Sequence, residues 1–287
     1  MTHDSPWPFP LKAVCGAREA RIPPEETVRL PRHISGKIFY IDKGRYMKIH
    51  DISTFVNLCR ELGISLTQRQ AGQFLSYYEF LTEKNKVMNL TAITEYDEVV
   101  TKHFLDSLLI VKAVDLSGVS SVMDLGTGAG FPGIPLKIAF PDLNITLADS
   151  LQKRIHFLDE CIQLCGLEKI RTIHGRAEDL GRDGAVRESY DWVGSRAVAY
   201  LSSLSEYCLP FVKVGGRFVA YKSAAIEEEF HEAEKAVRIL GGRSVPPVTE
   251  TIPGTDLKRS FVIIEKKAPT PKKYPRKAGT PGKDPIR

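Results

Sequence analysis

A glycine-rich run near the middle of the chain has the residue types of a loop that binds a nucleotide-like ligand. It extends from Asp124 to Gly133 and contains Gly126, Gly128 and Gly130. An apolar stretch typical of a buried strand precedes it and a helical pattern follows it, which is the context that such a loop requires. Glycine lets the backbone turn tightly and approach a ligand that a Cβ atom would block. We therefore expect Gly128 to lie against a bound cofactor.

A second acidic residue, Asp149, ends the next predicted strand, 21 residues after Gly128. At that position its carboxylate can accept hydrogen bonds from both hydroxyls of an adenosine ribose. The loop and this acid together predict a cofactor that contains adenosine.

Two adenosine cofactors fit a loop of this kind. A dinucleotide needs glycine at the third position of the motif and rests its pyrophosphate on a helix N-terminus, but this chain has Phe131 there, followed by Pro132. A sulfonium cofactor has a cationic amino-acid tail and favours an acid two residues before the first glycine, where Asp124 stands. The pattern favours S-adenosylmethionine over NAD. A glycine-rich turn without a ligand is the remaining alternative.

Further polar residues follow the later predicted strands. The loop after the third strand passes the adenine in this architecture, where the N–H of Ala177 and an acidic side chain such as Glu178 can bind the ring edge; acids here also suit a helix N-terminus. Arg196 follows the fourth strand and can pair with the cofactor carboxylate, with a phosphate of a substrate or in an ordinary surface ion pair. Lys222 ends the fifth strand as a candidate substrate contact or a solvated lysine.

The elements that must position these residues change in type near residue 118. Three helices are predicted before it, the third over residues 95–114, and strands alternate with helices after it. The predicted strands are residues 121–125, 144–149, 170–174, 191–195 and 217–222, with a final pair over 243–252 and 259–266. A turn is expected at Gly215 and Gly216. This pattern predicts an α/β, Rossmann-like fold with a seven-stranded, mostly parallel sheet and an N-terminal helical subdomain.

Four segments are predicted: an extension over residues 1–46 that is disordered or not part of the native protein, a helical subdomain over 47–117, a core over 118–267, and a basic tail over 268–287. Residues 265–287 carry a charge of +6 and residues 1–46 carry +3, which leaves −4 for residues 47–264 of a chain with net charge +5. A contact with a polyanion should therefore be localised at the tail. A solvated tail is the alternative.

Composition excludes several classes of protein. The chain is 43% hydrophobic and 26% charged, which is ordinary for a globular protein and unlike collagen-like, disordered or disulfide-rich sequences. Its five cysteines form no disulfide framework, and Cys161 and Cys165 stand four apart in a helical pattern. No apolar stretch approaches the length of a membrane span. We expect a cytoplasmic protein without membrane or metal partners.

Several of these residues resemble one family. The run from Asp124 to Gly133, the pair Ala177 and Glu178, and residues 195–197 are similar to the RsmG (GidB) methyltransferases, which act on N7 of a guanine in small-subunit ribosomal RNA. Outside the core, the resemblance extends to residues 89–91, 102–108, 259–266 and 274–281. It covers roughly residues 47–287, and the first 46 residues have no counterpart.

The resemblance implies a class I fold that uses S-adenosylmethionine, with cofactor contacts at Gly126, Phe131, Ala177, Glu178 and Arg196. Cofactor contacts at Asp124, Gly128 and Asp149 are predicted from residue types and spacing, independently of the resemblance. Its implied substrate is 16S ribosomal RNA near the 530 loop, either free or in a pre-assembled small subunit, and its implied state is a monomer. RNA contacts are expected from basic residues and a stacking tyrosine of the tail, together with Lys222: Lys272, Lys273, Tyr274, Arg276 and Lys277.

No catalytic base is expected, because guanine N7 carries a free lone pair and no proton. Proximity and alignment would then provide catalysis, with Arg196 as the one possible catalytic residue. His103 and Asp106, three apart on a helix, are interpreted as bonding to the core or positioning an RNA loop. The alternatives are a methyltransferase for another RNA, a protein or a small molecule, a non-catalytic RNA-binding module, and an NAD-dependent oxidoreductase.

Overall fold

The computed structural model describes residues 41–42, 45–46, 50–197 and 199–287, with side chains from residue 50 onward. The chain divides into two compact units, residues 1–57 and 58–287. In the first unit, strands β1 (Ile41–Asp42) and β2 (Arg45–Tyr46) pair antiparallel, and helix α1 (Ser53–Glu61) begins. Apart from these two strands, the predicted extension over residues 1–46 lies outside the described residues.

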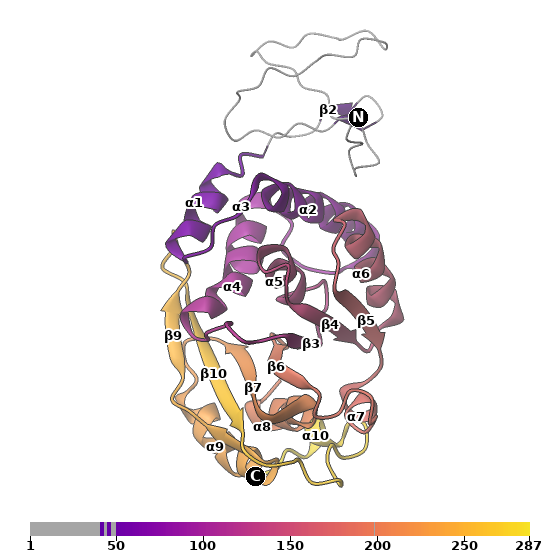
Figure 1. Cartoon of the computed structure of the whole chain (residues 1–287), viewed down its shortest axis with the longest axis vertical. Coiled ribbons are helices and arrows are strands. Elements are labelled where there is room, and N and C mark those ends of the chain that lie inside the picture. The colour runs from indigo at the N-terminus through magenta and orange to yellow at the C-terminus, as the bar shows by residue number, and fades with distance from the viewer. Residues whose placement is uncertain (1–40, 43–44, 47–49, 198) are drawn as a thin grey trace. The chain divides into compact units, whose positions relative to one another are not determined.

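The second unit is built on one sheet with the strand order β5-β4-β3-β6-β7-β10-β8, in which β9 also pairs with β10 (Figure 1). Its strands are β3 (Ser121–Leu125), β4 (Asn144–Asp149), β5 (Ile170–His174), β6 (Tyr190–Ser195), β7 (Val212–Lys222), β8 (Gly242–Ser244), β9 (Val248–Thr251) and β10 (Lys258–Lys266). Strands β3 to β7 run parallel, and β10 is antiparallel to each of its neighbours. The predicted fold class is confirmed, with eight strands in place of seven.

Two strand boundaries differ from the prediction. The strand expected over residues 243–252 is divided into β8 and β9, because Pro246 and Pro247 between them have no N–H to donate to the ladder. The turn expected at Gly215 and Gly216 was wrong, since both residues lie inside β7. The pairing of β7 with β6 shifts register near Trp192, and the positive φ of 90° at Gly215 lets the strand continue through this irregularity.

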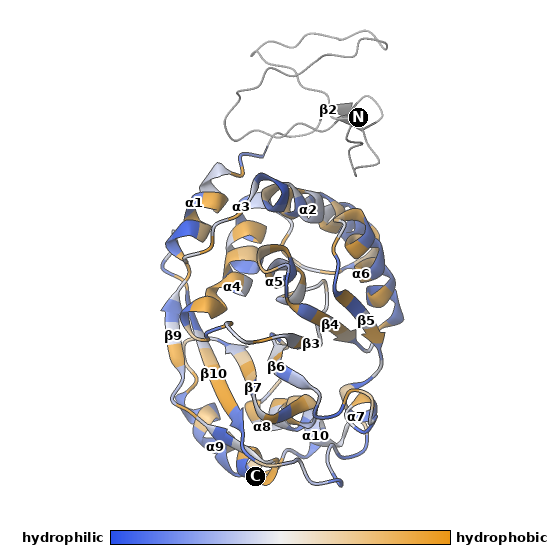
Figure 2. Cartoon of the chain, viewed as in Figure 1, coloured by the Kyte–Doolittle hydropathy of each residue, from blue (hydrophilic) through white to orange (hydrophobic). Residues whose placement is uncertain are grey.

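Helices cover both faces of this sheet. One face is covered by α2, α5 and α6, and the other by α8, α9 and α10 (Figure 1). The described helices after α1 are α2 (Gln68–Met88), α3 (Tyr96–Val99), α4 (Asp106–Leu108), α5 (Gly133–Ala139), α6 (Gln152–Leu164), α7 (Ala177–Leu180), α8 (Leu201–Cys208), α9 (Glu227–Ile239) and α10 (Thr280–Lys283). The long helices carry both hydrophobic and hydrophilic residues, whereas β10 is largely hydrophobic (Figure 2), as expected for helices that cover a buried sheet.

Helix α2 has defined ends and is bonded to helix α5 and to the end of helix α6. Thr67 and Gln70 form a capping box at its N-terminus, and Asn89 ends it in the left-handed conformation. The amide of Gln70 donates to the carbonyl of Ile138 at 2.8 Å, and that of Gln73 donates to the carbonyl of Cys165 at 2.8 Å. These long-range bonds include the helical segment in the same unit as the core. The predicted boundaries at 117/118 and 267/268 stay predictions.

The single helix predicted over residues 95–114 contains a π-helical turn. Helix α3 leads into π-helical residues Val100–Leu105, then α4, then a 3-10 turn over Leu109–Lys112. A π-turn inserts an extra residue and redirects the side chains that follow, and such turns are frequent at functional sites. This one carries His103 and immediately precedes Asp106.

Two glycine substitutions should have opposite effects on stability. A Cβ atom at Gly133, the first residue of α5, would lie 2.2 Å from Leu147 Cδ2 and 2.9 Å from Asp124 Oδ2, whereas one at Gly72 in α2 would meet no atom within 4 Å. We expect Gly133→Ala to lower the free energy of unfolding by about 1–3 kcal/mol through overpacking. Gly72→Ala should raise it by about 0.5–1 kcal/mol, because alanine loses less backbone entropy in a helix. Urea unfolding measures both; equal effects would refute the packing at Gly133.

Candidate active site

The carboxyl ends of four parallel strands meet at one edge of the sheet. The register pairs Leu125 of β3 with Ala148 of β4, and Asp149 with His174 of β5, while Asp124 lies opposite Gly194 of β6. Open parallel sheets bind ligands at this edge. The glycine loop, Asp149, Glu178 and Arg196 all follow it, so the structure gathers the predicted cofactor residues.

The glycines of the loop differ in what surrounds them. A Cβ atom at Gly130 would lie 2.5 Å from Ile134 Cδ1, so this glycine is required by packing. A Cβ atom at Gly126 would only touch the Cβ of Ala197 at 3.6 Å, and one at Gly128 would meet nothing within 4 Å. Both have positive φ, 72° and 62°. The protein itself therefore leaves room beside Gly126 and Gly128 for a ligand to approach the backbone.

Asp124 is the penultimate residue of β3, just before the glycine turns of the loop, and is fully buried. Its Oδ2 accepts hydrogen bonds from the hydroxyl of Thr127 at 2.6 Å and from the N–H of Gly133 at 2.8 Å. Its Oδ1 has no protein partner in the described structure. Burial raises the pKa of this carboxyl to about 6, and the two hydrogen bonds oppose the shift. Asp124 thus fixes the shape of the loop and keeps one buried oxygen for a donor.

Asp149, at the end of the neighbouring strand β4, is hydrogen-bonded to the backbone of the loop. Its Oδ2 accepts from the N–H of Gly128 at 3.0 Å and lies 3.2 Å from Arg154 Nη1, and its Oδ1 accepts from the N–H of Leu151 at 2.9 Å. A ribose hydroxyl would share this carboxylate with Gly128, because each oxygen can accept more than one hydrogen bond.

The aromatic ring of Phe131 connects the loop to the helical segment. It stacks on the His103 ring with centroids 4.4 Å apart, and it lies 5.4 Å from the ring of Tyr77. The hydroxyl of Tyr77, from α2, donates to the carbonyl of Ala129 at 2.6 Å. Tyr77 was not predicted from the sequence, because it lies within an ordinary helical repeat. Its full burial is the signal that could have identified it, since a buried tyrosine hydroxyl needs a hydrogen-bond partner.

A buried ion cluster holds Arg196. The Asp106 side chain is fully buried, and its Oδ2 lies 2.9 Å from Arg196 Nη2 while its Oδ1 accepts from Arg259 Nε at 2.5 Å. Arg196 also donates to Ser107 Oγ at 3.0 Å and to the carbonyl of Lys102 at 3.0 Å. Its guanidinium carbon lies 5.7 Å from the centre of the Phe131 ring. The ion pair is therefore a buried one rather than an ordinary surface pair.

His103 is held in the neutral form. Its Nε2 is 2.9 Å from Thr91 Oγ1, and its buried Nδ1 has no partner among the described atoms. Burial, with the nearby Arg196 charge as the next cause, lowers the pKa of His103 to about 4. Asn85 holds the Thr91 segment by bonding both its N–H and its carbonyl at 2.9 Å. Asp106 is therefore bonded to the core, whereas the hydrogen bond of His103 is to Thr91 of the helical segment. A role of either residue in positioning an RNA loop stays a prediction.

Glu178 begins α7 together with Ala177, just beyond β5, and is mostly buried. Its Oε1 accepts from the N–H of Gly279 in the C-terminal segment at 2.7 Å. Lys222 is engaged as well: its ammonium donates to the carbonyl of Ala199 at 2.5 Å and to Glu229 at 2.6 Å. An RNA phosphate would have to share that lysine with Glu229.

The basic tail is bound to the core rather than solvated. Tyr274 is buried, and Arg276 pairs with the fully buried carboxylate of Glu206 at 2.8 Å. Lys272, Lys273 and Lys277 are exposed on this bound segment. The tail is therefore not solvated along its whole length, and contact of its exposed lysines with RNA stays a prediction. Of the five residues predicted to bind RNA from the tail, three present free side-chain surface and two are packed or paired within the protein.

These residues fit an adenosine cofactor with a cationic tail. The open backbone at Gly126 and Gly128 suits close approach, and the unpaired buried oxygen of Asp124 suits a donor. No group of three or more His, Cys, Asp or Glu side chains in the described ranges is arranged to bind a metal ion. No helix within those ranges is both long and apolar enough to cross a bilayer.

The strand order with an antiparallel β10, together with a glycine loop after the first strand of the sheet, defines a class I methyltransferase fold. Residues 70–251 match the family model described as rRNA small subunit methyltransferase G. The chain is 52% identical over 238 residues to ribosomal RNA small subunit methyltransferase G of Lachnoclostridium phytofermentans, covering 83% of this chain and 98% of that protein. It is 50% identical to the protein of that name from Alkaliphilus metalliredigens over 229 residues, 80% of this chain and 96% of that one. This chain belongs to the rRNA small subunit methyltransferase G (GidB) family, which confirms the resemblance.

Replacing Asp124 with Asn should change the dependence of stability on pH. The pKa of Asp124 is about 6 in the folded state, above its ordinary value of 3.8. The stability contributed by protonation is therefore complete below about pH 4 and is lost as the pH rises through 6. A shift of about two pKa units corresponds to about 3 kcal/mol. In urea unfolding from pH 4 to 7, the wild type should lose about this much relative to Asp124→Asn, and parallel curves would contradict it.

His103→Gln is the internal control for that experiment. Because the pKa of His103 is lowered from 6.5 to about 4, its contribution to stability is complete above pH 6.5 and is lost as the pH falls through 4. The wild type should therefore lose stability relative to His103→Gln towards acid, the opposite slope to that of Asp124→Asn.

Gly128→Arg should abolish binding of S-adenosylhomocysteine, because the side chain fills the space beside the loop. Gly166→Arg is a matched control: Gly166 has a φ of 57°, and a Cβ there meets no atom within 4 Å. Both variants carry the same left-handed strain of about 1–2 kcal/mol. Calorimetry should show a loss beyond about a hundredfold, or about 3 kcal/mol, only at Gly128. Unchanged affinity for Gly128→Arg would refute the loop assignment.

Proposed function

We propose that the protein transfers a methyl group from S-adenosylmethionine to N7 of a guanine in 16S ribosomal RNA, in the region of the 530 loop. The observation that carries the proposal is the edge of the sheet in a chain of this family: Asp149 is bonded to an open glycine loop, and a fixed Arg196 lies over Phe131 of the same loop. The cytoplasmic location and monomeric state stay predictions that accompany it.

The cofactor would lie along the carboxyl edge of the strands. Gly126 and Gly128 would approach its amino-acid and ribose portions, and Asp149 would accept the ribose hydroxyls. Ala177 and Glu178 would bind the adenine ring. Phe131 would form the wall on the opposite side of the loop. Arg196 would pair with the cofactor carboxylate through its Nε–H, since Asp106, Ser107 and the carbonyls of the helical segment engage its two terminal nitrogens.

The cofactor, when bound, supplies a methyl group activated by positively charged sulfur. Guanine N7 needs no deprotonation, so the protein has to align two reactants rather than move a proton. The buried, rigid surroundings of Phe131 and Arg196 suit that task, because both side chains are fixed by several contacts. His103 stays neutral near pH 7 and adds no positive charge beside the site.

The RNA would contact the tail through exposed lysines. Lys272, Lys273 and Lys277 lie on a segment that is bound to the core and shares Glu178 with the cofactor region. A fixed basic segment next to the methyl-transfer site fits a folded RNA substrate better than a small molecule, which would need an enclosed pocket. Lys222 would contribute through its ion pair with Glu229, and Tyr274 and Arg276 would position the segment.

The direct test is transfer of tritiated methyl groups from S-adenosylmethionine to ribosomal RNA of a strain that lacks this activity, offered free and as small subunits. Borohydride reduction and aniline cleavage then locate N7-methylguanine. We expect one labelled guanine, and none with Gly128→Arg. Label in another RNA or in protein would support the alternative substrates, and cofactor binding without any label would support a non-catalytic RNA-binding module.

Removing two tail lysines should reduce the dependence of RNA affinity on salt. Each phosphate contact to single-stranded RNA contributes about 0.7 to the slope of log K against log salt. We therefore expect Lys272→Ala with Lys273→Ala to lower the slope by about 1.4. The pair Lys235→Ala and Arg238→Ala, on the exposed side of α9, should leave it unchanged. Equal slopes for all three proteins would exclude these lysines from the RNA interface.

A further inference from the structure

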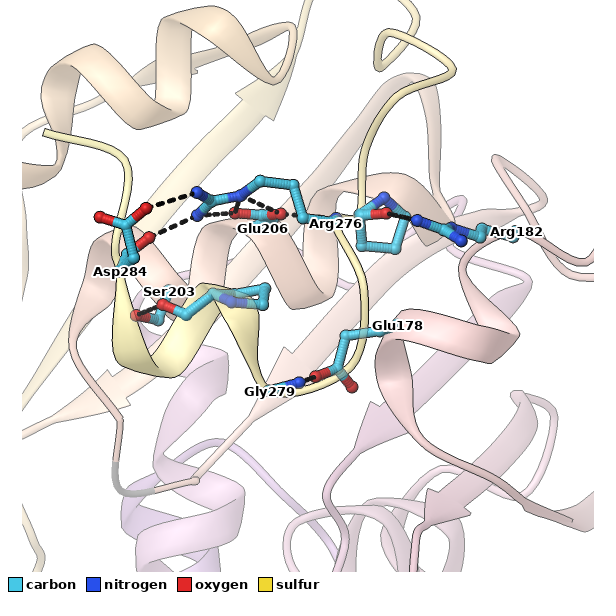
Figure 3. Close-up of polar contacts among 9 residues, drawn as sticks. Glu178, Arg182, Ser203, Glu206, Arg276, Gly279 and Asp284 are labelled. Atoms are coloured by element: carbon cyan, nitrogen blue, oxygen red, sulfur yellow. Dashed lines mark hydrogen bonds and ion pairs between the residues drawn. The ribbon is translucent and has the colours of Figure 1, made fainter.

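The C-terminal segment is fastened across the core at several points (Figure 3). Arg182, just after α7, donates to the carbonyl of Pro275 at 2.9 Å. Ser203 of α8 donates to the carbonyl of Pro281 at 2.7 Å. Between these two contacts, the segment makes its two charged ones, to Glu206 and to Glu178. It therefore spans from α7 to α8 beside the candidate cofactor site.

The contact with Glu206 is the strongest of them. Glu206 is fully buried in α8, and a buried carboxylate is tolerated only when it is paired and hydrogen-bonded. Arg276 supplies both: its Nε and Nη2 donate to the two carboxylate oxygens at 3.0 and 2.8 Å, and its backbone N–H donates at 2.7 Å. The hydrogen bonds that Arg276 donates to this carboxylate raise the pKa of Arg276. The ion pair therefore fixes the position of the C-terminal segment against α8.

Three residues further on, the same segment reaches the cofactor region. The N–H of Gly279 donates to Glu178 Oε1 at 2.7 Å, and Gly279 adopts a positive φ of 82°. One oxygen of Glu178 is thus held by the tail. The N–H of Gly175, at the start of the loop that leads to Glu178, donates to the carbonyl of Asp149 at 3.0 Å. The tail, Glu178 and the ribose-binding position are therefore connected by successive contacts.

We propose that Glu206 and Arg276 are positioning residues for the cofactor: their ion pair fixes the tail so that Gly279 orients the Glu178 carboxylate toward the adenine. This inference rests on the proposed function, because it takes Glu178 to bind the cofactor. The orientation of a carboxylate determines from which donors it can accept hydrogen bonds. Without the tail, the Glu178 side chain would be free to rotate. Neither Glu206 nor Arg276 touches the cofactor itself.

The coupling has to be reciprocal. If the bound tail raises affinity for the cofactor, then cofactor binding strengthens attachment of the tail by the same factor. A purely structural ion pair would stabilise the fold equally with and without cofactor.

The test uses the full chain with Glu206→Gln and Arg276→Lys. Calorimetry with S-adenosylhomocysteine should show about tenfold weaker binding for Glu206→Gln, within the usual range for coupled sites. The KM for S-adenosylmethionine should rise with kcat changed less than twofold. Arg276→Lys, which keeps the charge, should weaken binding less than Glu206→Gln does.

Two controls separate positioning from stability. Asp284→Asn removes the exposed outer partner of Arg276, 3.4 Å from Nη1, and should leave cofactor affinity unchanged. Val237→Ala opens a small cavity at a buried position of α9 that forms none of the polar contacts of this segment, and should lower the melting temperature without changing affinity. If Glu206→Gln behaves as Val237→Ala does, the positioning role is refuted.

One measurement needs no variant. Hydrogen exchange of the peptide that contains residues 276–284 should slow when S-adenosylhomocysteine binds the wild type. Binding without slower exchange would overturn the coupling even if both Glu206 and Arg276 variants fail to fold. Absence of any binding to the wild type would instead overturn the proposed function.

Discussion

A single buried carboxylate determines how the helical segment meets the sheet. Asp106 has no exposed side-chain surface, and a charge in that position costs several kcal/mol unless it is compensated. Arg196 comes from the end of β6 and Arg259 from β10, so two strands on different sides of β7 converge on one helix. With its terminal nitrogens bonded to Asp106 and to the helical segment, Arg196 is fixed beside Phe131. The glycine loop and the helical segment therefore pack against each other at this arginine.

This packing explains why the helical segment is more than a cover for the sheet. Tyr77 donates a hydrogen bond to the loop backbone, and the rings of Tyr77 and His103 both contact the ring of Phe131. Phe131 stands where a dinucleotide-binding motif has its third glycine. It is therefore packed against helices that a dinucleotide-binding fold does not need. The tail holds another residue of the candidate site, because the N–H of Gly279 donates a hydrogen bond to Glu178. A methyl transfer that depends on alignment benefits from both.

Much of the fold and part of the site could be predicted from the sequence, because they depend on local patterns. Strand ends place Asp149 and Arg196 at the same edge, and the glycine spacing identifies the loop. Contacts between distant residues could not be predicted: Arg276 was expected to face RNA because nothing local indicates Glu206, seventy residues away. Lys222 was ambiguous for the same reason. The π-turn before Asp106 was also missed, since a helical periodicity over residues 95–114 does not reveal an inserted residue.

The most direct measurement is a double-mutant cycle on S-adenosylhomocysteine affinity with Asp106→Asn and Arg196→Met. If Asp106 acts by holding Arg196, Asp106→Asn should weaken binding in the wild type but change it less than about twofold in the Arg196→Met background, because interacting residues are not additive. An equal loss in both backgrounds would contradict this, and would mean that the buried ion cluster supports the fold without positioning Arg196 for the cofactor.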